Sequence, residues 1–274
     1  MTNLRIDFTD QEVLSFLNRI EVTRSSPNRE FLGRIVSGII EHIPFQNVTM
    51  LTNEWKRPSN EMIKNDMING LGGLCTIRNP FLHEFLRYLG FDVEFVSSTI
   101  LEPDCHISLI VRIDNEEWWV DVGNGFPYLE PIKLGDSSVK HNWFMSYKLT
   151  FENNRYYVWH KLIGRDWQMN HHFSASCVEF SVFDRMHELH YSVPGWGPFL
   201  TGLRINRFWE NGAAIVRNDT VFSSAGQYKI SETTKLRNWL KSWFTKPGFL
   251  ESVDLPMADR IWRREKARLE KCRQ

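Results

Sequence analysis

The chain has 274 residues, and its 33 basic and 33 acidic side chains cancel to a formal net charge of zero. A hydrophobic content of 42% is enough to build a sizeable core, and the even charge argues against a protein that binds nucleic acid through a basic surface. No apolar run is long enough to span a membrane, and the polar first residues do not resemble a signal peptide.

The N-terminal part of the chain has the pattern of successive helices. Apolar residues recur at helical spacing over residues 13–20 and again over residues 31–40. A third, shorter helix is predicted to follow Ser59 or Asn60, because either side chain is a favourable N-cap. A fourth helical pattern begins at residue 75.

From residue 91 the pattern changes to strands rich in β-branched and aromatic residues. The predicted strands lie within residues 91–101, 106–114, 116–123, 144–151 and 155–162. The last two are joined by Glu-Asn-Asn, which is a turn signal and predicts a hairpin.

The C-terminal part of the chain is mixed. Residues 167–202 are predicted to be irregular, with a loop at Pro-Gly-Trp-Gly-Pro-Phe. A hairpin is predicted around Asn218-Asp219, followed by a helix with Ser231 as its N-cap. Residues 257–274 are predicted to form a charged helix with a solvated face. The order of helices, antiparallel strands and a mixed end predicts an α+β fold rather than a doubly wound sheet.

Cys75 stands directly behind Gly72 and Gly73 at the start of a helical pattern. The glycines allow a close backbone approach, and the N–H groups and dipole of a helix start favour a thiolate. A buried structural cysteine is the alternative interpretation. The four cysteines are widely separated and include no C-x-x-C pair, so we expect free thiols and a cytoplasmic location.

A catalytic thiol needs a base, and the base needs an acceptor that orients it. His106 begins one predicted strand, and Asp121 ends the next. If Asp114-Asn115 or Asn115-Glu116 forms a two-residue turn, Asp121 lies on the same face as His106, and in the first register the two are diagonal neighbours. A three-residue turn would separate them. Alone, each could be an ordinary structural residue, but together with Cys75 they predict a Cys-His-Asp triad.

Several motifs occur in a distinctive order. They are Ile-Pro-Phe-Gln-Asn at 43–47, the glycine pair before Cys75, the strand that begins at His106, and Asp-Val-Gly-Asn-Gly at 121–125 followed by a proline. In this order they resemble the arylamine N-acetyltransferase family, whose first motif is similar to Ile-Pro-Phe-Glu-Asn. The resemblance extends from about Phe16 to Pro131, which is nearly half of the chain.

The resemblance implies an activity and a role for each triad residue. Cys75 would accept the acyl group, His106 would hold Cys75 in a thiolate–imidazolium pair, and Asp121 would orient His106. Backbone N–H groups near Cys75 would bind the oxyanion. The acyl group would pass from acetyl-CoA to Cys75 and then to an aromatic amine, hydrazine or hydroxylamine, with no metal.

The resemblance also implies binding residues and domains. Substrate contacts are expected at Phe45, Asn124 and Phe126, and coenzyme A contacts at Gly123 and Gly125. The expected domains are a helical bundle carrying the nucleophile (1–90), a β-barrel-like domain carrying the histidine and aspartate (91–202), and a small α/β lid with the C-terminal helix (203–274). The core would resemble that of a cysteine protease.

The sequence departs from the family pattern at four positions. An arginine before the glycine pair is replaced by Leu71, and the glutamate of the first motif by Gln46. The resemblance implies the joint loss of a buried ion pair, which we interpret as a re-packed but intact pocket wall, with decay of a disused site as the alternative. Arg78 is predicted to face solvent, although contact with an anionic substrate is the alternative. Asn124 occupies a commonly aromatic position, which should weaken stacking with a flat amine, and Phe126 could compensate.

Other functions share parts of this pattern. An amide synthase that takes a large acyl chain from a carrier protein would have the same triad, as would a cysteine hydrolase. A binding protein without activity would not be acylated at all. A zinc site built from His171-His172, His187 and His190 is disfavoured, because adjacent side chains on a strand point to opposite faces.

Overall fold

The helices of the protein fall into an N-terminal and a C-terminal group. The computed structural model describes residues 4–272. The helices of this range are α1 (Asp10–Arg19), α2 (Arg29–His42), α3 (Val48–Thr52), α4 (Asn60–Ile68), α5 (Cys75–Tyr88), α6 (Asp184–Ser192), α7 (Thr233–Lys241), α8 (Phe249–Ser252) and α9 (Leu255–Cys272), with a 3₁₀ turn η1 (Phe180–Phe183) before α6.

Two antiparallel sheets contain the strands. The larger has the order β5 (Ile132–Lys133), β4 (Glu116–Val120), β3 (His106–Ile113), β2 (Asp92–Thr99), β9 (Gln168–Val178), β8 (Arg155–Leu162), β7 (Met145–Glu152) and β6 (Lys140–His141). The smaller has the order β1 (Phe45–Gln46), β10 (Arg204–Trp209), β11 (Gly212–Arg217), β12 (Thr220–Ser223) and β13 (Gly226–Lys229). The α+β fold with an antiparallel middle is therefore confirmed.

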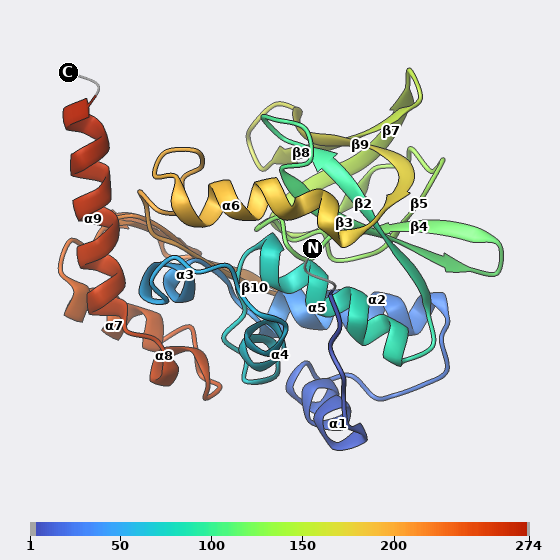
Figure 1. Ribbon diagram of the computed structural model, residues 1–274, viewed down its shortest axis with the longest axis horizontal. Helices are drawn as coiled ribbons and strands as arrows, with labels where there is room; N and C mark the ends of the chain where they lie inside the picture. The colour runs from blue at the N-terminus through green and yellow to red at the C-terminus, as the bar shows by residue number, and fades with distance from the viewer. Residues whose placement is uncertain (1–3, 273–274) are drawn as a thin grey trace.

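Helix α5 is positioned between the N-terminal helices and the larger sheet (Figure 1). The largest group of buried apolar side chains comes from α1, α2, α5 and one face of β2, β3 and β4. A separate group on the other face of that sheet includes side chains of β7, β8 and β9. The C-terminal helices α7, α8 and α9 pack with α3 and the smaller sheet. The domain boundaries predicted near residues 90 and 202 stay a prediction.

The hairpin of β3 and β4 has the first of the two predicted registers. Ile113 pairs with Glu116 and Leu109 with Val120, so the turn contains two residues, Asp114 and Asn115. Their φ angles are 51° and 62°, as in a type I′ turn. This turn type suits the right-handed twist of the strands, and it fixes which side chains share a face.

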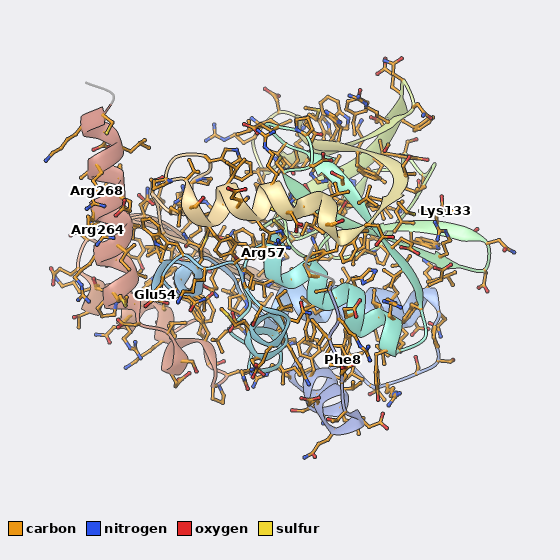
Figure 2. All side chains as sticks on the ribbon, in the orientation of Figure 1. Phe8, Glu54, Arg57, Lys133, Arg264 and Arg268 are labelled. Atoms are coloured by element: carbon orange, nitrogen blue, oxygen red, sulfur yellow. The ribbon has the colours of Figure 1, made fainter. Side chains whose placement is uncertain are left out.

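Several other predicted elements are confirmed. Ser59 is the N-cap of α4, and its side chain accepts a hydrogen bond from the N–H of Met62. The hairpins of β7 with β8 and of β11 with β12 lie where they were predicted. The charged helix α9 is also present, and it carries Arg264 and Arg268 (Figure 2). Both arginines form ion pairs with Glu265 of the same helix. Residues 273–274 of that prediction lie outside the described residues.

Two predictions about the C-terminal half are wrong. Residues 167–202 are not irregular, because β9 pairs with both β2 and β8 and is followed by η1 and α6. The sequence of β9 contains few β-branched residues, so its partners on both sides, rather than its own propensity, specify the strand. Ser231 is not the N-cap of α7. The chain stays extended there, with Ile230 donating to the carbonyl of Asp219, and Glu232 is the N-cap.

No helix among residues 4–272 combines the length and the apolar character that a membrane span requires.

The turn of the β3–β4 hairpin supplies a test of its register. Replacing Asn115 with valine puts a β-branched residue at a φ of 62°, which should lower the free energy of unfolding by about 1–2 kcal/mol. The matched control Asn115→Asp should stay within about 0.5 kcal/mol of the parent, because aspartate tolerates this conformation. Denaturant unfolding measures both values, and an unaffected Asn115→Val variant would contradict the turn geometry.

Candidate active site

Cys75 is the first residue of α5, and the backbone before it lies against another segment of the chain. The N–H of Gly73 donates to the carbonyl of Pro44 at 3.3 Å, and the carbonyl of Gly73 accepts from the N–H of Gln46 at 3.2 Å. A Cβ atom on Gly73 would lie only 2.6 Å from Cβ of Ile77. The predicted close approach is confirmed, and it leaves the free thiol of Cys75 5% exposed.

His106 and Asp121 form a buried hydrogen-bonded pair. His106 begins β3, and Asp121 directly follows β4. One step beyond the pairing of Leu109 with Val120, Asp121 lies opposite Ser108 and diagonal to His106. Nε2–H of His106 donates to Oδ2 of Asp121 at 2.7 Å, and the two residues are 2% and 1% exposed. The two-residue turn, as predicted, therefore brings the two side chains together on one face of the hairpin.

The charges of this pair stabilise each other. Burial opposes a charged imidazole, but the charge and hydrogen bond of Asp121, together with a hydrogen bond to Cys75, hold the pKa of His106 well above its ordinary value. Burial also opposes the carboxylate, but the charge and hydrogen bond of His106 lower the pKa of Asp121. At neutral pH His106 is thus an imidazolium between a carboxylate and a sulfur atom.

Asn79 fixes the second oxygen of the carboxylate. Its Nδ2 group donates to Oδ1 of Asp121 at 2.9 Å, and its Oδ1 accepts from the N–H of Val122 at 3.0 Å. Sequence reasoning did not assign this residue a role. The sequence did contain a signal for it: Asn79 lies four residues after Cys75, and this spacing puts both side chains on one face of a helix.

Gly123 allows the loop after Asp121 to lie against the start of α5. Its N–H donates to Oδ1 of Asp121 at 2.8 Å. A Cβ atom at this position would lie 2.6 Å from both Cα of Cys75 and Nδ2 of Asn79, closer than real contacts allow. The sequence Asp-Val-Gly therefore combines an oriented carboxylate with a backbone that lies directly against Cys75.

A largely apolar cavity of about 260 Å³ opens beside Cys75 and His106. The ring of His190 stacks on Phe199, and Phe199 contacts Phe45 edge-to-face with 6.2 Å between ring centroids. The other lining residues are Ile100, Leu101, Glu102, Cys105, Gly123, Asn124, Trp196, Gly197 and Pro198. The wall supplied by α6 and the following loop was missed, because that region was predicted to be irregular.

Residues 30–244 of the chain match the sequence model of the N-acetyltransferase family. The chain belongs to this family. The resemblance to arylamine N-acetyltransferases noted in the motifs is thereby confirmed, and the family is one of acyltransferases.

Individual relatives agree with this assignment. The acetyltransferase is 25% identical over 203 residues to the uncharacterized acetyltransferase YvcN of Bacillus subtilis, across 69% of this chain and 79% of that one. It is 30% identical over 141 residues to an arylamine N-acetyltransferase of Escherichia coli, across 47% and 46% of the two chains. The structure of the Mycobacterium marinum arylamine N-acetyltransferase in complex with CoA shares the fold, with a TM-score of 0.80, 18% identity, and coverage of 92% and 98%.

The expected binding residues of this acetyltransferase separate into two groups. Phe45, Gly123 and Asn124 line the cavity beside Cys75. Phe126 and Gly125 do not line it: the ring of Phe126 lies 4.4 Å from that of His160, and the carbonyl of Gly125 accepts from Asn206 at 2.8 Å. A Cβ atom on Gly125 would lie 3.0 Å from the ring of Phe45, so Gly125 packs against a residue of the wall without lining the cavity itself.

Arg78 does not face solvent, so that prediction is wrong. It is 2% exposed, and its guanidinium donates to the carbonyls of Val122 and Ile43 at 2.5 Å each. Burial lowers its pKa to about 9, although the charge of Asp121 acts in the opposite direction. Within residues 4–272 no carboxylate lies within 4.0 Å of it. Arg78 joins the loop after Asp121 to the segment before Phe45.

Gln46 is fully buried at the position where the family motif has glutamate. Its Nε2 group donates to Oγ1 of Thr49 at 3.0 Å, and its Oε1 accepts from the N–H of Thr49 at 3.1 Å. The amide is thus satisfied locally without a charged partner, while Leu71 is half-buried. A neutral, hydrogen-bonded group at this position agrees with the interpretation of a re-packed wall.

Three histidines of the acetyltransferase are buried and neutral. Burial is the largest cause of the shift in each case. It lowers the pKa of His171 and His190 to about 3 and the pKa of His187 to about 4. The four histidines considered above as a zinc site do not gather. Among the described residues, the group that could hold a metal instead combines His171 with His106 and Asp121.

These three histidines predict a loss of stability in mild acid. Below about pH 6.5 the unfolded chain binds a proton at each of them, while the folded chain does not, so the free energy of unfolding falls as the pH falls. The three together should lower it by about 3–4 kcal/mol between pH 6 and pH 5. Denaturant unfolding at both pH values measures this contribution by comparison of the parent with a histidine variant. The comparison is needed because burial raises the pKa of Asp66 to about 7, and its titration acts in the opposite direction. The variant His187→Gln should remove about a third of it, and an unchanged pH dependence would contradict the assignment.

Proposed function

We propose that Cys75 is the nucleophile of an acetyltransferase that takes an acetyl group from acetyl-CoA as a thioester and passes it to an aromatic amine, hydrazine or hydroxylamine. The observation that supports this most directly is the buried, hydrogen-bonded pair of His106 and Asp121, with His106 and Cys75 together at the wall of an apolar cavity. The four free cysteines also support a cytoplasmic location, where thiols stay reduced.

In the first half-reaction the thiolate of Cys75 attacks the thioester carbonyl of acetyl-CoA. The N–H of Cys75 belongs to the first turn of α5, where it has no partner within the helix and is suited to bind the oxyanion. As the tetrahedral intermediate collapses, the bond to the coenzyme A sulfur breaks and His106 gives its proton to that sulfur. Cys75 is left acetylated and His106 neutral.

In the second half-reaction the amine attacks the acetyl group on Cys75. His106 takes a proton from the attacking nitrogen, and the intermediate releases the Cys75 thiolate and the N-acetylated product. The imidazolium is restored beside the thiolate, so the cycle closes. Asp121 orients the ring and stabilises its charge in both steps, and Asn79 and Gly123 hold Asp121 in place.

The shape of the cavity supports a flat, apolar acceptor. Phe45, Trp196 and Phe199 provide ring faces and edges for an aromatic amine, while Asn124 supplies a polar edge. Among the described residues that line the cavity, none is lysine or arginine. We therefore expect the thioester end of the donor to enter the cavity and its phosphates to stay outside.

The mass of the intact protein after mixing with acetyl-CoA, without an acceptor, tests this proposal. The parent should gain one acetyl group that an added arylamine or hydrazine removes, and Cys75→Ala should gain none. An acetyl group on the alanine variant would show that Cys75 is not the nucleophile. A parent that is alkylated at Cys75 but never acetylated would contradict acetyl-CoA as the donor and favour a carrier-protein thioester.

The same assay tests the role of Asp121. The variant Asp121→Asn keeps the shape of the side chain but loses the charge that holds the His106 imidazolium, so acetylation should slow by about 10³-fold or more. Asp166→Asn, on the exposed turn before β9, is the matched control and should acetylate at the parental rate. Circular dichroism confirms folding. An Asp121→Asn variant that is folded and is acetylated at the parental rate would disprove the triad.

A further inference from the structure

His171 lies beside the triad and has no role in the proposed reaction. Its side chain is fully buried on β9. Nδ1 of His171 lies 2.6 Å from Oδ1 of Asn170, and Nδ2 of Asn124 also donates to that oxygen. Because an amide oxygen only accepts hydrogen bonds, the proton of His171 resides on Nδ1, and Nε2 carries a lone pair.

The lone pair on Nε2 of His171 has no hydrogen-bond partner among residues 4–272. A buried polar atom without a protein partner is costly, so a ligand that pairs with this atom removes that cost. The atom is therefore an electron-pair donor that no group of the described residues occupies.

His171, His106 and Asp121 each offer a ligand atom within 4.8 Å of the other two, and all three residues are buried. The rings of the two histidines lie 5.1 Å apart between centroids. Two imidazoles and one carboxylate are a preferred ligand set for Zn²⁺. A histidine that binds a metal also commonly donates its other ring N–H to an oxygen, as His171 does to Asn170.

We propose that His106, Asp121 and His171 bind a Zn²⁺ ion that inhibits the enzyme. Ligand atoms about 2.1 Å from a tetrahedral ion lie about 3.4 Å apart. The widest of the present separations, which lie within 4.8 Å, must therefore shorten when the ion binds, and the 2.7 Å between Nε2 of His106 and Oδ2 of Asp121 must widen. The fourth position of the ion is left for water.

Binding of the ion displaces a proton that the reaction requires. In the metal-free protein Nε2 of His106 carries the proton that it donates to Asp121. Zn²⁺ takes the electron pair of that nitrogen and one of Asp121, so this proton leaves to solvent and the hydrogen bond is broken. His106 then no longer pairs as an imidazolium with Cys75. The inhibition, though not the binding, rests on the proposed function.

Calorimetric titration of the full chain with Zn²⁺ measures the binding directly. One ion should bind to the parent, and His171→Gln should bind it about 100-fold more weakly or worse, because a ligand is lost. His172→Gln is the matched control: this neighbour points to the opposite face of β9, toward Tyr157, and should bind like the parent. Equal affinities in all three proteins would overturn the proposal.

Two further variants separate this site from the common binding of zinc to a reactive thiol. Cys75→Ala should keep the parental affinity, and a large loss there would overturn the proposed ligand set. Asp121→Asn should lose affinity as His171→Gln does, which provides a second test should His171→Gln fail to fold. Since these titrations do not depend on turnover, their outcome is separate from that of the acetylation assay.

Discussion

The hydrogen bond between His106 and Asp121 is the interaction on which the site depends. Both groups are almost completely buried, so each would be unstable as an ion without the other. The two-residue turn at Asp114 and Asn115 brings them together, because it fixes the register of β3 against β4. A local choice of turn geometry thus determines whether the pair of His106 and Asp121 forms beside Cys75.

The first turn of α5 connects the site to the rest of the fold. Cys75 faces the cavity, the hydroxyl of Thr76 lies 2.9 Å from that of Tyr191 on α6, and Arg78 and Asn79 bond to the loop that follows β4. These four positions thereby line the cavity and bond to other parts of the chain, among them α6 and the loop after β4. The first turn of α5 is buried, but its polar side chains have hydrogen-bond partners in these neighbouring segments. Their polar groups are therefore enclosed without being left unsatisfied.

Most of the architecture could be predicted because its signals are local. Helical spacing, caps and turn residues marked the N-terminal helices and the hairpins, and the period of the strands placed His106 and Asp121 on one face. The rest depends on tertiary partners. Strand β9 is specified by pairing with β2 and β8, and Arg78 is buried because two carbonyls accept its hydrogen bonds. Neither cause leaves a periodic pattern in the sequence.

The central claim is that Asp121 holds His106 as an imidazolium beside Cys75. Nitrogen-15 chemical shifts of the His106 ring, followed from about pH 6 to pH 9 and assigned with His106→Gln, test it most directly. Because the pKa of His106 is raised well above its ordinary value, the ring should lose its second proton at a clearly higher pH than a free imidazole does. A ring that loses its proton near pH 6.5 would contradict the account.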